Sequence, residues 1–287
     1  MGIKEYVKRV GRYLLKGVPE NHVTANIVIA SNDLLKGRKA LITGGTSGIG
    51  FAIASAFLRN GATVIITGRN EQRLANACNE LSQMNSVYKD FVSYQVMDVR
   101  NIRNVASVFK ENLQLRGVDL LVNNAGVLGG DITVATEEVY DNILDTNLKG
   151  AFFLTQIVAK NMKVAKVKGN ILNIASSSSL RPASSAYTLS KWGMRGFTLG
   201  MAKVLAPYGI TVNGIAPGPT ATPMLLKGKM SELTLDSSPV GRYALPEEIA
   251  NMAVVLTSEM GRMVVGDIVY MTGGAGLITF DDMHYKF

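Results

Sequence analysis

The sequence predicts an α/β protein with a doubly wound, Rossmann-like parallel sheet covered by helices on both faces. Short runs of β-branched and apolar residues alternate with helical patterns from Lys36 onward. These runs are apolar at consecutive positions, as in strands that are buried on both faces. Hydrophobic residues make up 47% of the 287 residues, which is enough for one large core. The alternation therefore indicates three layers, α/β/α, in a single domain.

The first strand is expected at 39–43, before the glycine-rich turn TGGTSGIG at 43–50 and a helix at 51–61. A second strand and a second helix are expected at 62–67 and 71–84. The later strands should lie within the segments 91–99, 118–126, 169–177, 209–218 and 266–274. Parallel strands bring their carboxyl ends to one edge of the sheet, and a doubly wound fold binds its ligands there.

The basic character of the chain is concentrated before this domain. Residues 1–39 carry a net charge of +5 out of a total of +8, so a nucleic-acid partner is not predicted for the body. We expect an extension at 1–35, a catalytic domain at 36–277 and a tail at 278–287. Apolar residues at helical spacing predict a basic amphipathic helix in the extension: Ile3, Tyr6, Val7, Val10, Tyr13 and Leu14. Packing on this chain or another subunit is favoured over weak membrane-surface contact.

The reactive side chains exclude two kinds of site. Cys78 is the one cysteine, so no intramolecular disulfide forms, and a reducing, cytoplasmic location is expected. Cys78, His22 and His284 are scattered without the spacing of metal ligands, so we expect no metal site. No signal peptide or membrane-spanning run is apparent.

The glycine-rich turn is typical of a dinucleotide site. Gly44 lets the chain turn sharply after the strand, and Gly48 and Gly50 permit close backbone approach and tight helix packing. The following helix points its unpaired N–H groups and its positive dipole end at the turn, which favours a pyrophosphate. The spacing is G-x-x-x-G-x-G, and similar turns also occur without ligands, so the flanking strand and helix carry the interpretation.

The second strand ends in the sequence TGRN, with Arg69 at the position that selects the cofactor. No Asp or Glu stands beside it to bind a ribose 2′-hydroxyl, whereas an arginine fork matches a 2′-phosphate. NADP(H) is therefore favoured, and NAD(H) is the alternative, with Arg69 solvated or stacked on adenine.

Six motifs in order make the chain resemble the short-chain dehydrogenase/reductase family: TGGTSGIG, MDV, NNAG, DTNLKG, Y-x-x-x-K and APG. The resemblance covers about 35–277. It implies an NAD(P)-dependent oxidoreductase acting on CH–OH groups. Tyr187 would be the general acid/base and Lys191 its partner, Ser176 would bind the substrate oxygen, and Asn147 would kink its helix and hold a water. The implied cofactor-binding residues also include Tyr187 and Lys191, and the others are Gly44, Thr46, Ser47, Gly48, Ile49, Gly50, Arg69, Asp98, Val99, Asn124, Ala125, Gly126, Pro217, Gly218 and Thr222.

The tyrosine and lysine also make chemical sense on their own. Residues four apart share one face of a helix, so Lys191 lies beside Tyr187. Reducing a ketone requires a hydride on carbon and a proton on the developing alkoxide. The reference pKa of tyrosine is about 10, and a neighbouring ammonium favours the phenolate that the reverse reaction needs. An isolated pair of this kind is more often structural, so the surrounding motifs carry the catalytic interpretation.

The active-site serine is the least defined position. Ser176 follows strand residue Asn173 at the family spacing, but it precedes Tyr187 by eleven residues where thirteen are usual. A shorter loop explains the difference, and Ser177 is the other candidate. Arg181, in the same loop, could bind a carboxylate or phosphate or could anchor the loop.

Substrate specificity is expected in the segment 220–242, a flap with the apolar residues Met224, Leu225 and Leu226. Lys227 or Lys229 could meet an anionic group or remain solvated. The helix after Tyr187 carries more apolar residues than one core face needs, namely Trp192, Met194, Phe197 and Leu199. A homotetramer or homodimer is therefore expected, with a fully internal helix as the alternative.

Three functions are compatible with a nucleotide-binding α/β fold. The first is reduction of a ketone or oxidation of a secondary alcohol, with a 3-oxoacyl thioester, a sugar derivative, a steroid or a small ketone as substrate. The second is a catalytically inactive dinucleotide sensor or scaffold, and the third is a methyltransferase. The oxidoreductase is favoured because Asn147, Ser176, Tyr187 and Lys191 are all present.

Overall fold

The computed structural model describes residues 33–226, 233, 235 and 237–276. Seven parallel strands in this part of the chain form one sheet in the order β3-β2-β1-β4-β5-β6-β7. The strands are β1 Lys39–Thr43, β2 Thr63–Gly68, β3 Val92–Val96, β4 Leu120–Asn123, β5 Asn170–Ile174, β6 Thr211–Pro217 and β7 Ile268–Met271. The predicted fold class is confirmed.

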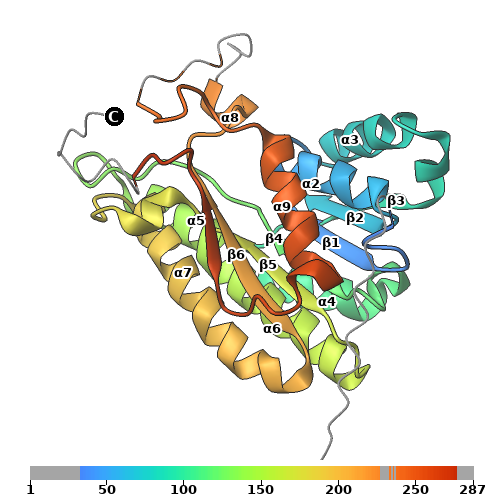
Figure 1. Ribbon diagram of the computed structural model, residues 1–287. Coiled ribbons are helices and arrows are strands. Elements are labelled where there is room, and N and C mark those ends of the chain that lie inside the picture. The colour runs from blue at the N-terminus through green and yellow to red at the C-terminus, as the bar shows by residue number, and fades with distance from the viewer. Residues whose placement is uncertain (1–32, 227–232, 234, 236, 277–287) are drawn as a thin grey trace, which may run out of the picture.

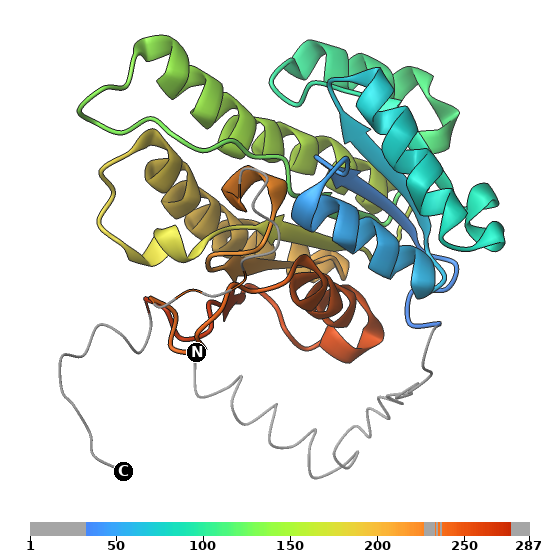
Figure 2. The same ribbon diagram turned by 90° about the horizontal axis from the view of Figure 1, so that it is seen from above.

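Helices cover both faces of the sheet (Figures 1 and 2). One face carries α2 Gly48–Arg59, α3 Glu71–Gln83 and α9 Pro246–Thr257. The other carries α4 Ile102–Glu111, α6 Gly150–Val164 and α7 Ala186–Leu205. The short helices α5 Glu137–Leu144 and α8 Pro223–Leu226 lie on the carboxyl-end side of the sheet.

The central strands are apolar at consecutive positions because both of their faces are buried. β1 is buried from Ala40 to Thr43, and β5 along its whole length. Ile42 packs toward the layer of α2 and α9, whereas Leu41 packs toward the layer of α4 and α6. Leu35, which the sequence assigned to the extension, is fully buried in this core and donates its N–H to the Asn60 carbonyl at 2.8 Å.

Side-chain caps start the helices that frame the site. Asn70 accepts a hydrogen bond from the N–H of Arg73 at the start of α3, and Ser185 accepts one from Thr188 at the start of α7. Such caps satisfy N–H groups that have no partner within the helix. The cap at Ser185 fixes the first turn of α7, which contains Tyr187.

The strand order reverses between β1 and β4, so the connections after these two strands diverge to opposite faces of the sheet. A crevice opens at such a point, outside the carboxyl ends of the strands. The glycine-rich turn follows β1, and the NNAG segment follows β4. The fold thus brings together the motifs that the sequence singled out.

Candidate active site

The glycine-rich turn forms a cradle with no side chains in its way. Gly44 and Gly48 have φ angles of 66° and 57°, in the left-handed region that favours glycine. A Cβ atom at Gly50 would collide with the Asn124 side-chain amide and the Gly44 carbonyl oxygen. The first turn of α2 contains no acidic residue, and the N-cap residue Ser47 makes no side-chain cap. The backbone N–H groups and the helix dipole therefore face the turn and suit a pyrophosphate.

Thr43 and Asn124 hold this turn against β4. The Thr43 Oγ1 accepts hydrogen bonds from the N–H groups of Asn124 and Ala125, both at 2.9 Å. The Asn124 amide donates to the carbonyls of Thr43 and Gly44, at 2.9 and 3.1 Å. Asn124 thus supports the loop directly. Sequence reasoning missed Thr43, since its bonding partners lie 81 and 82 residues away.

Arg69 is exposed at the end of β2 and lines this crevice. Arg73 lines the same crevice from the first turn of α3, and sequence reasoning missed it. The signal available was its position in the first turn of the helix that starts at the carboxyl end of the second strand. No acidic residue other than Asp98 lines this crevice within the described chain.

Asp98 is held by Arg100 through a bidentate ion pair. The Arg100 Nη2 lies 2.7 Å from the Asp98 Oδ2, and the Nε lies 3.0 Å from the Oδ1. These hydrogen bonds lower the pKa of Asp98, and the charge of Arg69 adds a smaller effect in the same direction. Arg100 also donates to the Asn142 side chain on α5, and Val99 packs on Gly150 at the start of α6. Arg100 was not predicted, and it keeps the Asp98 carboxylate ionised and oriented.

Tyr187, Lys191 and Ser176 meet where β5 gives way to α7. The Lys191 Nζ lies 5.7 Å from the centroid of the Tyr187 ring and donates a hydrogen bond to the Ile174 carbonyl at 2.8 Å. The Lys191 side chain is buried and has no carboxylate partner in the described chain, and this desolvation lowers its pKa from 10.5 to about 8. Burial raises the pKa of Tyr187, and a hydrogen bond with Ser176 opposes that rise.

Of the two serine candidates, Ser176 is the one that contacts Tyr187. Its Oγ also caps the 3₁₀ turn Ser177–Leu180 (η4) by accepting from the Ser178 N–H at 3.1 Å. Ser177 is buried beside it and lines the same cavity. The short loop expected from the eleven-residue spacing corresponds to this compact turn.

Asn147 lies in a π-helical turn, Asp145–Lys149 (η3), between α5 and α6. Its amide donates to the Val127 carbonyl and the Ser190 Oγ, both at 3.0 Å, and its Oδ1 accepts from the Val127 N–H at 2.8 Å. Ser190 in turn donates to the Tyr187 carbonyl at 2.6 Å. The irregular turn agrees with the expected kink, and π turns are frequent at functional sites. Asn147 is buried behind the cavity wall and links two segments of that wall.

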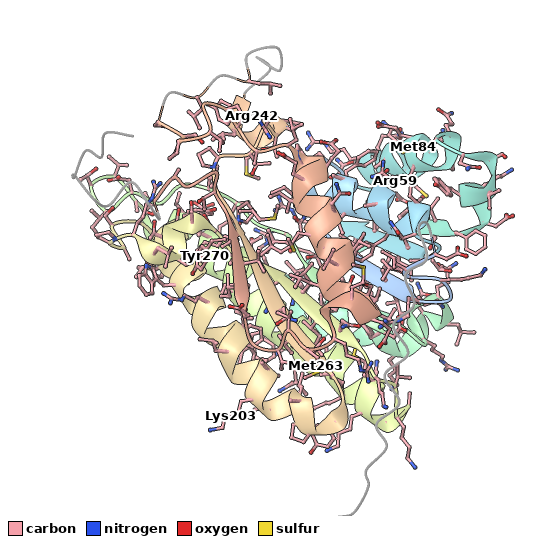
Figure 3. All side chains as sticks on the ribbon, in the orientation of Figure 1. Arg59, Met84, Lys203, Arg242, Met263 and Tyr270 are labelled. Carbon is pink, nitrogen blue, oxygen red and sulfur yellow. The ribbon has the colours of Figure 1, made fainter. Side chains whose placement is uncertain are left out.

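The segment after β6 closes the other end of the crevice. Gly218 donates its N–H to the Met271 carbonyl at 2.9 Å, and Thr222 lies opposite Gly48, 3.2 Å from where a Cβ would stand. Arg242, labelled in Figure 3, forms a bidentate ion pair with Glu248 of α9, at 2.7 and 2.9 Å. Met224 and Leu225 are exposed and line the crevice. Lys227, Lys229 and the Leu226 side chain lie outside the described residues.

One cavity of about 570 Å³ runs through all these groups. Every sequence-predicted site residue lines it except Gly50 and Asn147, which act from behind its wall. Two buried hydroxyl groups at this cavity, those of Thr67 and Thr146, have no hydrogen-bond partner in the described chain. Buried polar atoms are normally paired, so these two suit a polar ligand. Together with the glycine cradle, they fit the cofactor that the sequence implies.

Within residues 33–226 and 237–276, no cluster of three or more His, Cys, Asp and Glu side chains suits a metal ion. No helix in these ranges combines the length and hydropathy needed to cross a bilayer. The side chains that line the cavity offer hydroxyl, ammonium, guanidinium and carboxylate groups, beside the backbone dipoles of the glycine-rich turn.

Comparison with known proteins agrees with this geometry. The model of the short chain dehydrogenase family matches residues 38–231. The 3-oxoacyl-[acyl-carrier-protein] reductase FabG of Aquifex aeolicus is 33% identical over 246 residues, covering 84% of this chain and 98% of its own.

Two solved structures are similar across the whole body. Actinorhodin polyketide ketoreductase with NADPH is 31% identical at a TM-score of 0.75, covering 84% of this chain and 97% of its own. The 3-ketoacyl-(acyl-carrier-protein) reductase of Brucella melitensis, complexed with NADH, is 29% identical at a TM-score of 0.75, covering 85% and 100%. The chain therefore belongs to the short-chain dehydrogenase/reductase family and is an oxidoreductase of carbonyl and alcohol groups that binds a nicotinamide dinucleotide.

Proposed function

We propose that this protein reduces a ketone to a secondary alcohol with NADP(H), and that Tyr187 is its general acid. The observation that carries the proposal is the convergence of Tyr187, Ser176 and Lys191 at one end of a cavity whose other end is the glycine cradle. When bound there, the cofactor supplies or accepts the hydride. The side chains of this protein bind the substrate oxygen and supply its proton.

Ser176 and Tyr187 act on the substrate oxygen. The Ser176 hydroxyl lies close enough to Tyr187 to oppose the rise in its pKa, and both residues line one cavity, so a carbonyl oxygen placed between the two hydroxyls would accept from each. As negative charge develops on that oxygen, Tyr187 gives up its phenolic proton, and the product is a neutral alcohol. The phenolate left on Tyr187 lies near the Lys191 ammonium, which favours the ionised form.

Asn147 and Lys191 hold the acid in place. Lys191 ties α7 to the end of β5, and Asn147 ties the π-helical turn to Ser190 of α7 and to Val127. Proton transfer requires a heavy-atom separation near hydrogen-bond length, so this fixed geometry matters. The proposed role of Asn147 also includes a bound water that returns a proton to Tyr187.

The two arginines at the adenosine end favour NADP(H) over NAD(H). Arg69 and Arg73 line the cavity there, and the one carboxylate nearby, Asp98, is paired with Arg100. A 2′-phosphate would gain charge-assisted hydrogen bonds from the arginine forks. The similar solved structures include one with NADPH and one with NADH, so the preference rests on these residues.

Two of the three relatives are named as 3-oxoacyl (3-ketoacyl) carrier-protein reductases, which supports a 3-oxoacyl thioester as the first substrate to test. The experiment is an NADPH-oxidation screen over β-keto thioesters, simple ketones, keto-sugars and keto-steroids. Turnover on a ketone, abolished in Tyr187→Phe, supports the proposal. Tight NADPH binding without turnover on any ketone would instead favour a dinucleotide sensor.

We also propose that the protein is a cytoplasmic homotetramer or homodimer assembled through α6 and α7. Phe152, Leu189, Trp192 and Leu199 are all exposed on these two helices, which agrees with burial by a second copy and not with a fully internal α7. The domain includes Leu35, which is buried in its core, and we propose that it ends near residue 277. We also propose that the extension packs on this chain or on another subunit. Light scattering of the wild type and of Trp192→Glu with Leu199→Glu tests the assembly, and an unchanged mass would contradict this interface.

A further inference from the structure

Arg181 occupies a fixed position at the substrate end of the cavity. It follows the turn η4, of which Ser176 is the N-cap, so one compact turn connects the two residues. The Arg181 N–H donates to the Ser178 carbonyl at 3.2 Å, and the Arg181 carbonyl accepts from the Trp192 Nε1 at 2.8 Å. Its backbone, and not its side chain, therefore anchors the loop to α7.

The Arg181 side chain is not needed to anchor the loop and faces the cavity. It lines the cavity, and its guanidinium lies close to Gly276, with Nη2 3.5 Å from where a Cβ of that glycine would stand. Within the described chain it forms no ion pair or side-chain hydrogen bond. Asp98 is the one carboxylate of the described residues that lines the cavity; it is at the adenosine end and is paired with Arg100. Among residues 33–226 and 237–276, the substrate end thus carries positive charge without an acidic side chain to balance it, which attracts an anion.

The walls between Arg181 and the reacting groups are partly apolar. Leu128, Met224 and Leu225 are exposed and line the same cavity, from the loop after β4 and from α8. The four residues of η4 separate Ser176 from Arg181, and a 3₁₀ turn rises about 2 Å per residue, so the two backbones lie on the order of 10 Å apart. A ligand that contacts both would need a short apolar chain between its two polar ends.

We propose that Arg181 is a specificity-determining residue that binds an anionic oxyacid group on the substrate, joined to the reacting ketone by an apolar tether of about 10 Å. The substrate class is then a medium-chain oxo acid. This inference rests on the proposed function, since it takes Ser176 and Tyr187 as the groups that hold the ketone. The planar guanidinium fork suits a carboxylate or a phosphate. An anion at the far end of a long carrier arm would lie beyond this reach.

Trp192 provides a binding assay that does not depend on turnover. It is the one tryptophan of the chain, and its indole is hydrogen-bonded to Arg181. The Trp192 fluorescence is titrated with 9-oxodecanoate and, separately, with its methyl ester. Each titration is done without cofactor and with NADP⁺, because a ketone cannot be reduced under either condition. The acid should bind wild type more tightly than the ester, and Arg181→Gln should weaken the acid about tenfold and the ester hardly at all.

The control is Arg195→Gln, which removes the same charge from α7. Arg195 stacks on the Trp192 ring, 5.5 Å from its centroid, and does not line the cavity. This variant should leave the preference for the acid intact. Arg181→Lys keeps the positive charge but loses the guanidinium fork, so it should prefer the acid over the ester more than Arg181→Gln does and less than wild type does. A role of Arg181 in stability alone would weaken the acid and the ester equally, and that result would overturn the proposal.

Steady-state kinetics distinguish the two possible sources of the anion, the carboxylate of a free oxo acid and the phosphate of a phosphopantetheine arm. NADPH oxidation is compared for 9-oxodecanoate against its ester, and for acetoacetyl-4′-phosphopantetheine against acetoacetyl-pantetheine. We expect Arg181→Gln to raise KM about tenfold for the oxo acid, with kcat and both pantetheine substrates little changed. An effect on the phosphopantetheine substrate alone would overturn the short tether. If no ketone is turned over, the proposed function fails, while the fluorescence titration still decides whether Arg181 binds the acid.

Discussion

Raising the pH above 8 is expected to stabilise the cofactor-free protein through Lys191. The Lys191 side chain is 5% exposed, and its hydrogen-bond partner is a neutral carbonyl, so burial lowers its pKa from 10.5 to about 8. Below pH 8 the ammonium is protonated in both the folded and the unfolded state. Between pH 8 and 10.5 the unfolded chain keeps this proton and the folded chain has lost it. The free energy of unfolding therefore rises across this window, by about 3 kcal/mol in total.

The assay is urea unfolding of the wild type and Lys191→Met between pH 7 and 10.5, followed by circular dichroism. The stability of wild type relative to the variant should increase by about 3 kcal/mol across the window. Tyr187, whose pKa is raised, works in the opposite direction above pH 10, but it is present in both proteins. Lys203→Met, at an exposed lysine on the same helix, is the control and should show no such difference (Figure 3). Parallel pH profiles for wild type and Lys191→Met would refute the assignment of a desolvated lysine.

Three further changes test other parts of the account. Arg69→Ala should weaken NADPH about tenfold and NADH much less, as measured by cofactor fluorescence; equal affinities of wild type for the two cofactors would contradict the proposed preference. Gly48→Val places a branched side chain at a φ of 57° and against Thr222, so calorimetric titration should show cofactor binding weakened by at least about tenfold; an unchanged Kd would mean that this turn does not hold the cofactor. Arg38→Gln removes a largely buried ion pair with Asp119, whose atoms are 2.6 Å apart, and should lower the free energy of unfolding by about 2 kcal/mol while leaving activity intact; a loss below about 0.5 kcal/mol in urea unfolding would refute that role.

Local patterns were enough to predict the framework of the site. Strand, glycine turn and helix follow one another directly between Lys39 and Arg59, so the cradle could be placed without tertiary information. The same holds for Tyr187 and Lys191, because a helix fixes their relative positions. The π-helical turn at Asn147 was expected only as a kink, since its form depends on bonds to Val127 and Ser190, twenty and 43 residues away.

Other contacts depend on the tertiary structure and were not predictable from spacing. Arg100 reaches Asn142 on α5, and Arg38 reaches Asp119 across 81 residues. The choice between Ser176 and Ser177 also depended on three dimensions, since only the path of η4 shows which hydroxyl meets Tyr187. Arg181 illustrates the limit most clearly. The sequence left open whether it anchors its loop or binds an anion, and the structure assigns the anchoring to its backbone.

The central claim is that Tyr187 gives its proton to the substrate oxygen, and Tyr187→Phe tests it most directly. The measurement is single-turnover oxidation of bound NADPH by a ketone that wild type reduces, with the NADPH Kd measured in parallel. The account predicts an NADPH Kd within about twofold of wild type and a rate lower by about 100-fold to 10,000-fold, the usual contribution of a positioned acid. A variant that reduces the ketone within about twofold of the wild-type rate would contradict it.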